Sequence, residues 1–252
     1  MFFFREKLTE TIKLPLFFLI SCLIIFFIYT FTNPIPTDSF ISSVGTGAKI
    51  LDLGDRSFYL EYDSNLRGSF LYPSILKIIT IFTENFNLGN TSKLWNIIAI
   101  SLTSSFSILN LFLIDKSCWN IFGSKVAKIT NWLYVICPYT IFYSISGGLT
   151  MYLMLGTSLL TYVISRSSIF NNNYQSIGLV KTYIYTLFCA IYISSLRPTG
   201  AIFGISVITI LLITTIIKLK SKKLSVSRKD LIKIICIFFI TLFFCIYQLL
   251  SV

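Results

Sequence analysis

Seven apolar segments alternate with short charged stretches along the chain. A helix needs about 20 mostly apolar residues to cross ~30 Å of hydrocarbon, and its backbone groups must find their hydrogen-bond partners within the segment itself. The pattern therefore predicts an all-α, polytopic transmembrane helical bundle with about seven spans. The predicted spans are Leu14–Phe31, Leu94–Ile114, Ile129–Tyr143, Leu149–Ile164, Thr182–Leu196, Ala201–Ile217 and Leu231–Leu250.

The first apolar segment, Leu14–Phe31, is interpreted as a retained helix rather than a signal peptide. It is longer than the usual apolar core of a signal peptide, and the Thr-Asn-Pro-Ile-Pro sequence after it offers no small-residue cleavage site. We therefore treat residues 1–252 as a single transmembrane domain.

A long stretch of about residues 32–93 separates the first two segments and holds six of the ten acidic residues. Inside it lies an apolar run, Phe70–Phe82, interrupted by Pro73 and Lys77. This run has two interpretations: a short membrane span, or an amphipathic helix lying in the membrane interface.

The distribution of charge favours the interfacial helix. With Phe70–Phe82 lying flat, the inner pieces carry 15 of the 21 Lys and Arg residues and four acids, while the outer pieces carry six of each. The whole net charge of +11 then falls on one side, as the positive-inside rule expects. The sequence predicts a cytoplasmic N-terminus, an inner loop at Asp115–Lys128 and a long first outer loop carrying interfacial amphipathic helices.

Composition excludes several classes of protein. Charged residues make up 12% of the chain, against about 25% in soluble domains, and the mean hydropathy is +0.80. The basic residues gather at the ends of apolar segments and form no stripe with exposed aromatics, so we expect no nucleic-acid partner. Histidine is absent and the six cysteines are dispersed, which leaves little for a zinc or haem site.

Candidate chemistry is concentrated in the outer loop. Asp52, Asp55, Glu61 and Asp63 lie within twelve residues, next to aromatic side chains. A solvated acidic loop is one interpretation. The order of residues favours a functional one, because Asp55 is followed by Tyr59, then Gly68, then the Tyr72-Pro73 pair that opens the apolar run.

This order resembles that of the GT-C superfamily of polytopic glycosyltransferases, which use lipid-phosphate-linked sugars and include protein O-mannosyltransferases, aminoarabinose transferases of lipid A and mannosyltransferases of the glycolipid-anchor pathway. Members share a first helix and a long outer loop with an essential acid. Three further landmarks match: the basic stretch Asp115–Lys128, the turn Cys137-Pro-Tyr-Thr-Ile-Phe-Tyr-Ser144, and Arg197-Pro-Thr-Gly200. The resemblance covers Leu14 to about Gly200.

The resemblance implies a membrane glycosyltransferase whose donor is a polyprenyl-phosphate-linked sugar at the outer membrane face. A carboxylate would act as general base on the acceptor hydroxyl, with Asp55 as the first choice and Asp52 as the second. Arg197 would bind the leaving phosphate, because guanidinium pairs with phosphate bidentately; capping a helix against lipid head groups is its alternative role. Tyr59 and Tyr143 would line the sugar site, with anchoring in the aromatic belt as the alternative.

We expect no cofactor and no metal; a divalent metal at Asp52 and Asp55 is the alternative, although two acids form a weak cage. The family often carries an acid after the Tyr-Ser turn, and Gly147-Gly-Leu-Thr150 has none. Members also usually have more helices and often a C-terminal domain, so a minimal form, a truncated product and a degenerate paralogue all stay open.

The alternative function is that of a non-catalytic membrane protein: a transporter, an assembly subunit or an inactive relative. Transporters usually place ionisable groups inside the membrane, whereas the predicted spans here are nearly free of charge. The expected partners are the lipid-linked donor and membrane lipids, and the oligomeric state is left open. We expect a bacterial plasma membrane, with the endoplasmic reticulum as the alternative location.

Overall fold

A computed structural model describes residues 10–32, 91–145, 148–170, 177–197, 199–221 and 226–250, together with several positions between 71 and 82. Regular structure in these residues is helical, apart from one isolated bridge between Ser167 and Ile177. The prediction of an all-α protein is confirmed for this part of the chain. Its eight helices are α1 (Glu10–Thr32), α5 (Thr91–Phe122), α6 (Ser124–Ile136), α7 (Pro138–Ile145), α8 (Leu149–Ser165), α9 (Leu179–Leu196), α10 (Thr199–Lys220) and α11 (Arg228–Leu250).

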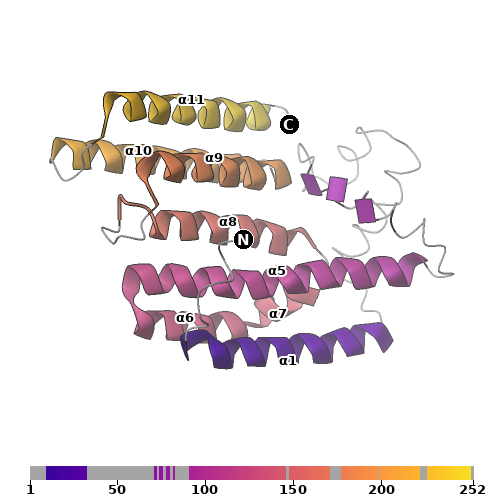
Figure 1. The fold of residues 1–252 in the computed structure, drawn as a ribbon. Helices are drawn as coiled ribbons and strands as arrows, with labels where there is room; N and C mark the ends of the chain where they lie inside the picture. The colour runs from indigo at the N-terminus through magenta and orange to yellow at the C-terminus, as the bar shows by residue number, and fades with distance from the viewer. Residues whose placement is uncertain are drawn as a thin grey trace.

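The long helices lie side by side and alternate in direction along the chain (Figure 1). Helix α5 packs against α1, α6, α7 and α8, and helix α9 packs against α8, α10 and α11. The bundle therefore consists of an N-terminal group around α5 and a C-terminal group around α9, with α8 between them. One end of the bundle, at the left of Figure 1, holds the start of α1 and the turns α5–α6, α8–α9 and α10–α11.

Four described helices are long and apolar enough to cross a membrane: Ile97–Phe122 within α5, and the whole of α9, α10 and α11. A fifth span results if α7 and α8, which bend by 116° at their junction, form one broken span. This is consistent with an integral membrane protein. The count of about seven spans stays a prediction.

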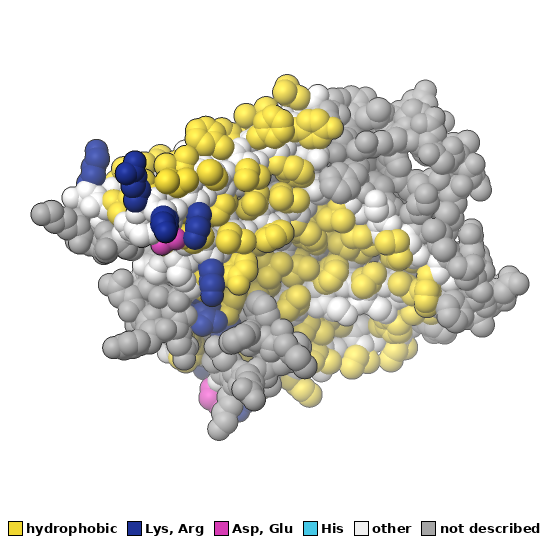
Figure 2. Space-filling model, turned by 45° about the horizontal axis from the view of Figure 1, so that its top comes forward, with side chains coloured by type: hydrophobic (Ala, Val, Ile, Leu, Met, Phe, Trp, Pro, Cys, Tyr) yellow, Lys and Arg dark blue, Asp and Glu magenta, His cyan; other side chains and the backbone are white. Residues whose placement is uncertain are grey.

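Large apolar side chains cover the outside of the described helices (Figure 2). On α11 the exposed ones include Ile232, Phe239 and Phe243, while Ile234, Thr241 and Cys245 are buried against the neighbouring helices. A soluble protein would not leave so much of a helix surface apolar. Such a surface is instead suited to contact with lipid.

Close approach of helices depends on two small residues. A Cβ atom on Gly204 of α10 would lie 3.1 Å from the Cβ of Ala190 on α9 and 3.2 Å from the Sγ of Cys245 on α11. A Cβ atom on Gly156 of α8 would lie 2.5 Å from Ile193 of α9. Packing through small residues is the usual way in which membrane helices approach closely.

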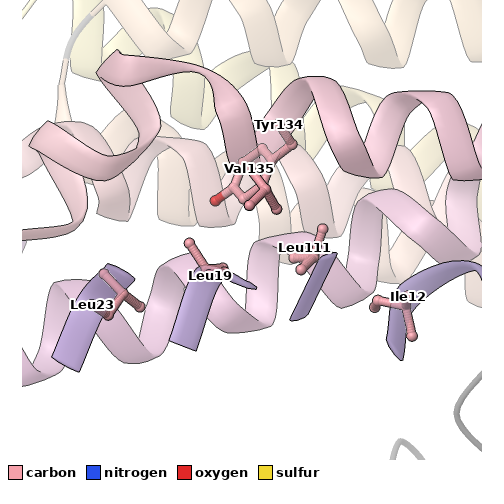
Figure 3. Close-up of a cluster of buried hydrophobic side chains, with 6 residues drawn as sticks. All are labelled: Ile12, Leu19, Leu23, Leu111, Tyr134 and Val135. Carbon is pink, nitrogen blue, oxygen red and sulfur yellow. The ribbon is translucent and has the colours of Figure 1, made fainter. Parts of the chain in front are cut away.

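At the start of the chain, α1 packs into the groove between α5 and α6. Figure 3 shows this apolar cluster, in which every labelled side chain is buried. Its residues are Ile12, Leu19 and Leu23 from α1, Leu111 from α5, and Tyr134 and Val135 from α6.

The predicted inner loop at Asp115–Lys128 is wrong. Helix α5 continues to Phe122 and α6 begins at Ser124, so the turn is confined to Gly123, whose φ of +83° is a conformation that glycine adopts readily. The predicted span ends at Ile114 because polar residues follow it. No residue between Asp115 and Phe122, however, interrupts the hydrogen bonding of the helix backbone. The helix therefore extends beyond the apolar segment.

The third predicted span, Ile129–Tyr143, is interrupted. Helix α6 ends at Ile136, Cys137 has an extended backbone with ψ of 118°, and α7 starts at Pro138. A residue before proline is pushed out of the helical region by the proline ring, which explains the break.

Candidate functional site

Landmarks far apart in the sequence meet at the end of the bundle opposite the α5–α6 turn. Tyr72, Ala99, Tyr152 and Leu196 form one buried cluster that joins the 71–82 segment to α5, α8 and α9. Arg197 follows Leu196 directly. The structure therefore brings the Tyr72 landmark and the Arg197 landmark to the same end of the bundle (Figure 1).

The described part of the 71–82 segment is helical and is buried on one side. Tyr72 and Ile79 are buried, whereas Ile78 and Phe82 are exposed. The described positions are thus helical, with buried and exposed side chains in alternation. The interfacial amphipathic helix stays a prediction.

An aromatic group lies at the centre of this end. The ring of Tyr152 is 5.4 Å from that of Tyr72 and 4.9 Å from that of Phe106, edge to face in both cases. Tyr192 of α9 packs against the same cluster. Among the described residues, neither the buried hydroxyl of Tyr152 nor the buried hydroxyl of Ser195 on α9 has a hydrogen-bond partner. Buried polar groups nearly always find partners, so both hydroxyls are candidates for contact with water or a ligand.

The Tyr143–Ser144 landmark is fixed to α5 near the same end. The hydroxyls of Thr103 and Ser104 both donate to the backbone carbonyl of Ser144, at 2.7 and 3.1 Å. Tyr143 itself is half-buried and stacks on Tyr139 with ring centroids 6.3 Å apart. These bonds satisfy a carbonyl group near the end of α7 and hold Tyr143 in place.

Arg197 lies in the tight connection between α9 and α10. Its backbone is extended, its N–H donates to the carbonyl of Ile193, and its own carbonyl accepts from the N–H of Gly200 at 2.8 Å. Its side chain is half-buried. Lys93, in the first turn of α5, is placed at the same end of the helices as Arg197, and the other Lys and Arg residues that the structure describes lie at the opposite end.

Three predicted site residues, Asp52, Asp55 and Tyr59, fall outside the described residues, as does Gly68. The geometry between the predicted base and Arg197 is therefore a prediction. Within the described ranges, no three His, Cys, Asp or Glu side chains gather in a way that would hold a metal ion.

A second polar cluster lies at the opposite end and was missed by the sequence analysis. Asp115, counted there as part of an inner loop, is fully buried inside the candidate span of α5. Its Oδ1 accepts from the hydroxyl of Thr11 at 2.7 Å and from the amide of Asn131 at 2.6 Å. Asp115, which the sequence analysis placed outside the predicted spans, is therefore an ionisable residue within a candidate span. The cluster ties α1, α5 and α6 together.

We expect Asp115→Ala to lower the free energy of unfolding by about 1–3 kcal/mol, because the Thr11 hydroxyl and the Asn131 amide lose their acceptor in a buried place. Unfolding in mixed detergent micelles measures this. Ser105→Ala is the matched control, since the Ser105 hydroxyl is exposed on the same helix and bonds only to its own helix backbone. Equal stability of Asp115→Ala and the wild type would contradict the structural role.

Tyr152, Tyr192 and Ser195 were also missed by the sequence analysis. Within an apolar segment, the sequence does not distinguish a tyrosine or serine that faces lipid from one that faces the other helices. Their positions along the predicted spans could have indicated that they lie at the same end of the bundle, because Tyr152 is near the start of α8 and Tyr192 is near the end of the antiparallel α9. No protein-family model, curated protein or solved structure matches this chain.

Proposed function

We propose that this chain is a membrane glycosyltransferase of the GT-C type, which transfers a sugar from a polyprenyl-phosphate-linked donor to an acceptor at the outer membrane face. One observation carries the proposal. Tyr72 and Leu196, which precedes Arg197, share a buried cluster although more than a hundred residues separate them, and the anchored Ser144 lies near the same end. These are the segments that the motif order singles out.

The proposed topology has seven spans, a cytoplasmic N-terminus and a bacterial plasma membrane as its location. The segregation of charge supports it. Apart from Arg197 and from Lys93 in the first turn of α5, the described Lys and Arg residues lie at the end of the bundle that holds the start of α1. Cationic residues are retained on the cytoplasmic side of membrane proteins, so this end would face the cytoplasm and the Arg197 end would face outwards.

In the proposed reaction, an acceptor hydroxyl attacks the anomeric carbon of the donor and a carboxylate takes its proton. Asp55 is the proposed base and Asp52 the alternative. The leaving group is a polyprenyl phosphate, whose negative charge a guanidinium stabilises well. Arg197 suits this role because it is a half-buried cation in the α9–α10 connection at that end. Tyr59 and Tyr143 are proposed to line the sugar site.

The alternative is a non-catalytic membrane protein, and the buried Asp115 is the observation in its favour, since an ionisable group inside a span often serves transport. Its contacts argue for an interhelical anchor instead. The Thr11 hydroxyl on α1 and the Asn131 amide on α6 both donate to the Asp115 carboxylate, so the carboxylate joins two other helices to α5.

The test uses the purified chain in lipid vesicles with a radiolabelled polyprenyl-phosphate sugar and an extract of acceptor glycans. Label should leave the lipid when the chain is present and stay on it when the chain is omitted. A nucleotide sugar is the control donor and should not react. Absence of transfer from every polyprenyl-phosphate sugar, by a folded chain, would shift the assignment to the non-catalytic alternative.

A further inference from the structure

The ends of α9, α10 and α11 that lie opposite Arg197 carry a cluster of basic side chains, here called the basic rim: Lys181, Lys220, Arg228 and Lys229. All four are exposed. The three helices contact one another, so the four side chains gather on one edge of the bundle. Figure 2 shows Lys and Arg side chains gathered at one edge of the molecule.

The acid beside the rim does not neutralise it. Asp230 accepts from the Ser227 hydroxyl at 2.8 Å and lies 3.5 Å from Lys233, a further cation outside the rim. Lys218 is likewise engaged, because its ammonium donates to the carbonyl of Ile169 and lies 5.9 Å from the centre of the Phe170 ring. The four rim residues therefore add positive charge that the described part of the chain does not balance locally.

Next to the rim, the surface is aliphatic. Ile213 and Ile217 on α10 and Ile232 and Ile235 on α11 are each more than one-third exposed, and they begin within a turn or two of the rim. Figure 2 shows this change from basic to apolar surface across one face. A soluble anion would use only the charges. A phospholipid would place its phosphate on the rim and its acyl chains along the aliphatic side chains.

We propose that the basic rim is a binding surface for anionic phospholipids, with the lipid phosphate on Lys220, Arg228 and Lys229 and the acyl chains on the exposed aliphatic side chains of α10 and α11. Basic residues at a membrane surface attract anionic lipid at short range, and Arg in particular pairs with phosphate through two parallel hydrogen bonds. This binding is independent of the proposed glycosyl transfer.

The same charges also favour one orientation during insertion, so the test uses purified protein, where orientation has no influence. Native mass spectrometry in detergent gives the dissociation constant for an added phosphatidylglycerol and, as the zwitterionic reference, for a phosphatidylcholine with the same chains. The test variant is Lys220→Gln/Arg228→Gln/Lys229→Gln. The matched control, Lys13→Gln/Lys125→Gln/Lys128→Gln, removes three exposed cations from the same end of the bundle but from α1 and α6.

The wild type should bind phosphatidylglycerol more tightly than phosphatidylcholine. The rim variant should lose about tenfold or more of its affinity for the anionic lipid, because each cation near the phosphate contributes several-fold. The control should lose less than about threefold, as distant surface charges are screened by salt.

Equal losses in the rim variant and in the control would overturn the proposal, since they would mean that net charge alone binds the lipid. Displacement of the lipid by millimolar inorganic phosphate would also overturn it in favour of a soluble anion. Should the triple variant aggregate, Lys220→Arg/Lys229→Arg carries the test: it keeps the charges and should bind like the wild type, whereas Lys220→Gln/Lys229→Gln should bind several-fold more weakly.

Discussion

We expect Asp55→Asn to transfer sugar about 10²- to 10⁴-fold more slowly than the wild type, which is the usual contribution of a general base. An amide has nearly the shape of the carboxylate but does not accept a proton from the attacking hydroxyl. The loss should therefore appear in kcat. The measurement is the initial rate of label release from the polyprenyl-phosphate sugar, with both proteins in vesicles at matched amounts.

The control for this prediction is Asp38→Asn, another acid in the same stretch of residues 32–93. It removes the same charge from that stretch and should keep nearly the full rate. Asp52→Asn distinguishes the two candidate bases, because only the substitution of the true base should lower the transfer rate by the full 10²- to 10⁴-fold. Should Asp55→Asn and the wild type transfer sugar at the same rate, the assignment of Asp55 as base is wrong.

The second large effect is expected at Gly200, where a single methyl group would collide with backbone. A Cβ atom there would lie 2.5 Å from the carbonyl oxygen of Ile193 and 2.8 Å from its carbonyl carbon. Unlike a flexible side-chain tip, this carbonyl is held inside α9 and accepts the N–H of Arg197. We therefore expect Gly200→Ala to push the start of α10 away from α9.

Forced overpacking of this kind costs about 1–3 kcal/mol. The measurement is unfolding of Gly200→Ala in mixed micelles, with Gly178→Ala as the matched control, because a Cβ atom at Gly178 has nothing within 4 Å and Gly178 precedes α9. The Gly200 N–H donates a hydrogen bond to the Arg197 carbonyl, so a shift of Gly200 should also displace Arg197. Sugar transfer should therefore fall in Gly200→Ala and stay unchanged in Gly178→Ala. Equal stability of the two variants would contradict the close contact between α9 and α10.

The helices of the C-terminal half could be predicted well from hydropathy. The segment Thr182–Leu196 is α9 without its first turn, and Ala201–Ile217 is α10 without either end. The missing residues include Lys181 of α9 and Lys218 and Lys220 of α10, at helix ends where the backbone keeps its hydrogen bonds although the side chains are charged. Hydropathy reports the environment of the side chains, and helical continuity depends on the backbone.

The same difference explains the errors in the N-terminal half. Asp115 ends an apolar segment by composition, yet α5 continues past it because the carboxylate finds donors on Thr11 and Asn131. In the opposite sense, Ile129–Tyr143 is apolar throughout, but Pro138 interrupts the helix. The proline could have been weighed from the sequence. The two partners of Asp115 could not, because Thr11 is 104 positions away along the chain and Asn131 is 16 positions away, and only the tertiary fold brings them together.

Only those residues of the candidate site that belong to a recognisable sequence motif could be predicted from the sequence. Tyr72 and Arg197 were singled out by their neighbours in the sequence, and they lie at one end of the bundle. Tyr152 and Ser195 carry no such neighbours. They are of interest because their hydroxyls are buried and have no hydrogen-bond partner in the described part of the chain, and this depends on the way in which α8 and α9 face each other.

The most direct test of the proposed function is the amount of free polyprenyl phosphate that forms when vesicles containing the wild type or Asp55→Asn are incubated with a polyprenyl-phosphate sugar and acceptor. The phosphate is the product that every sugar and acceptor would leave behind, so the measurement does not depend on knowing either. The proposal predicts that it accumulates with the wild type and hardly at all with Asp55→Asn. If neither protein forms free polyprenyl phosphate, although each is folded and inserted, the result would contradict the assignment as a glycosyltransferase.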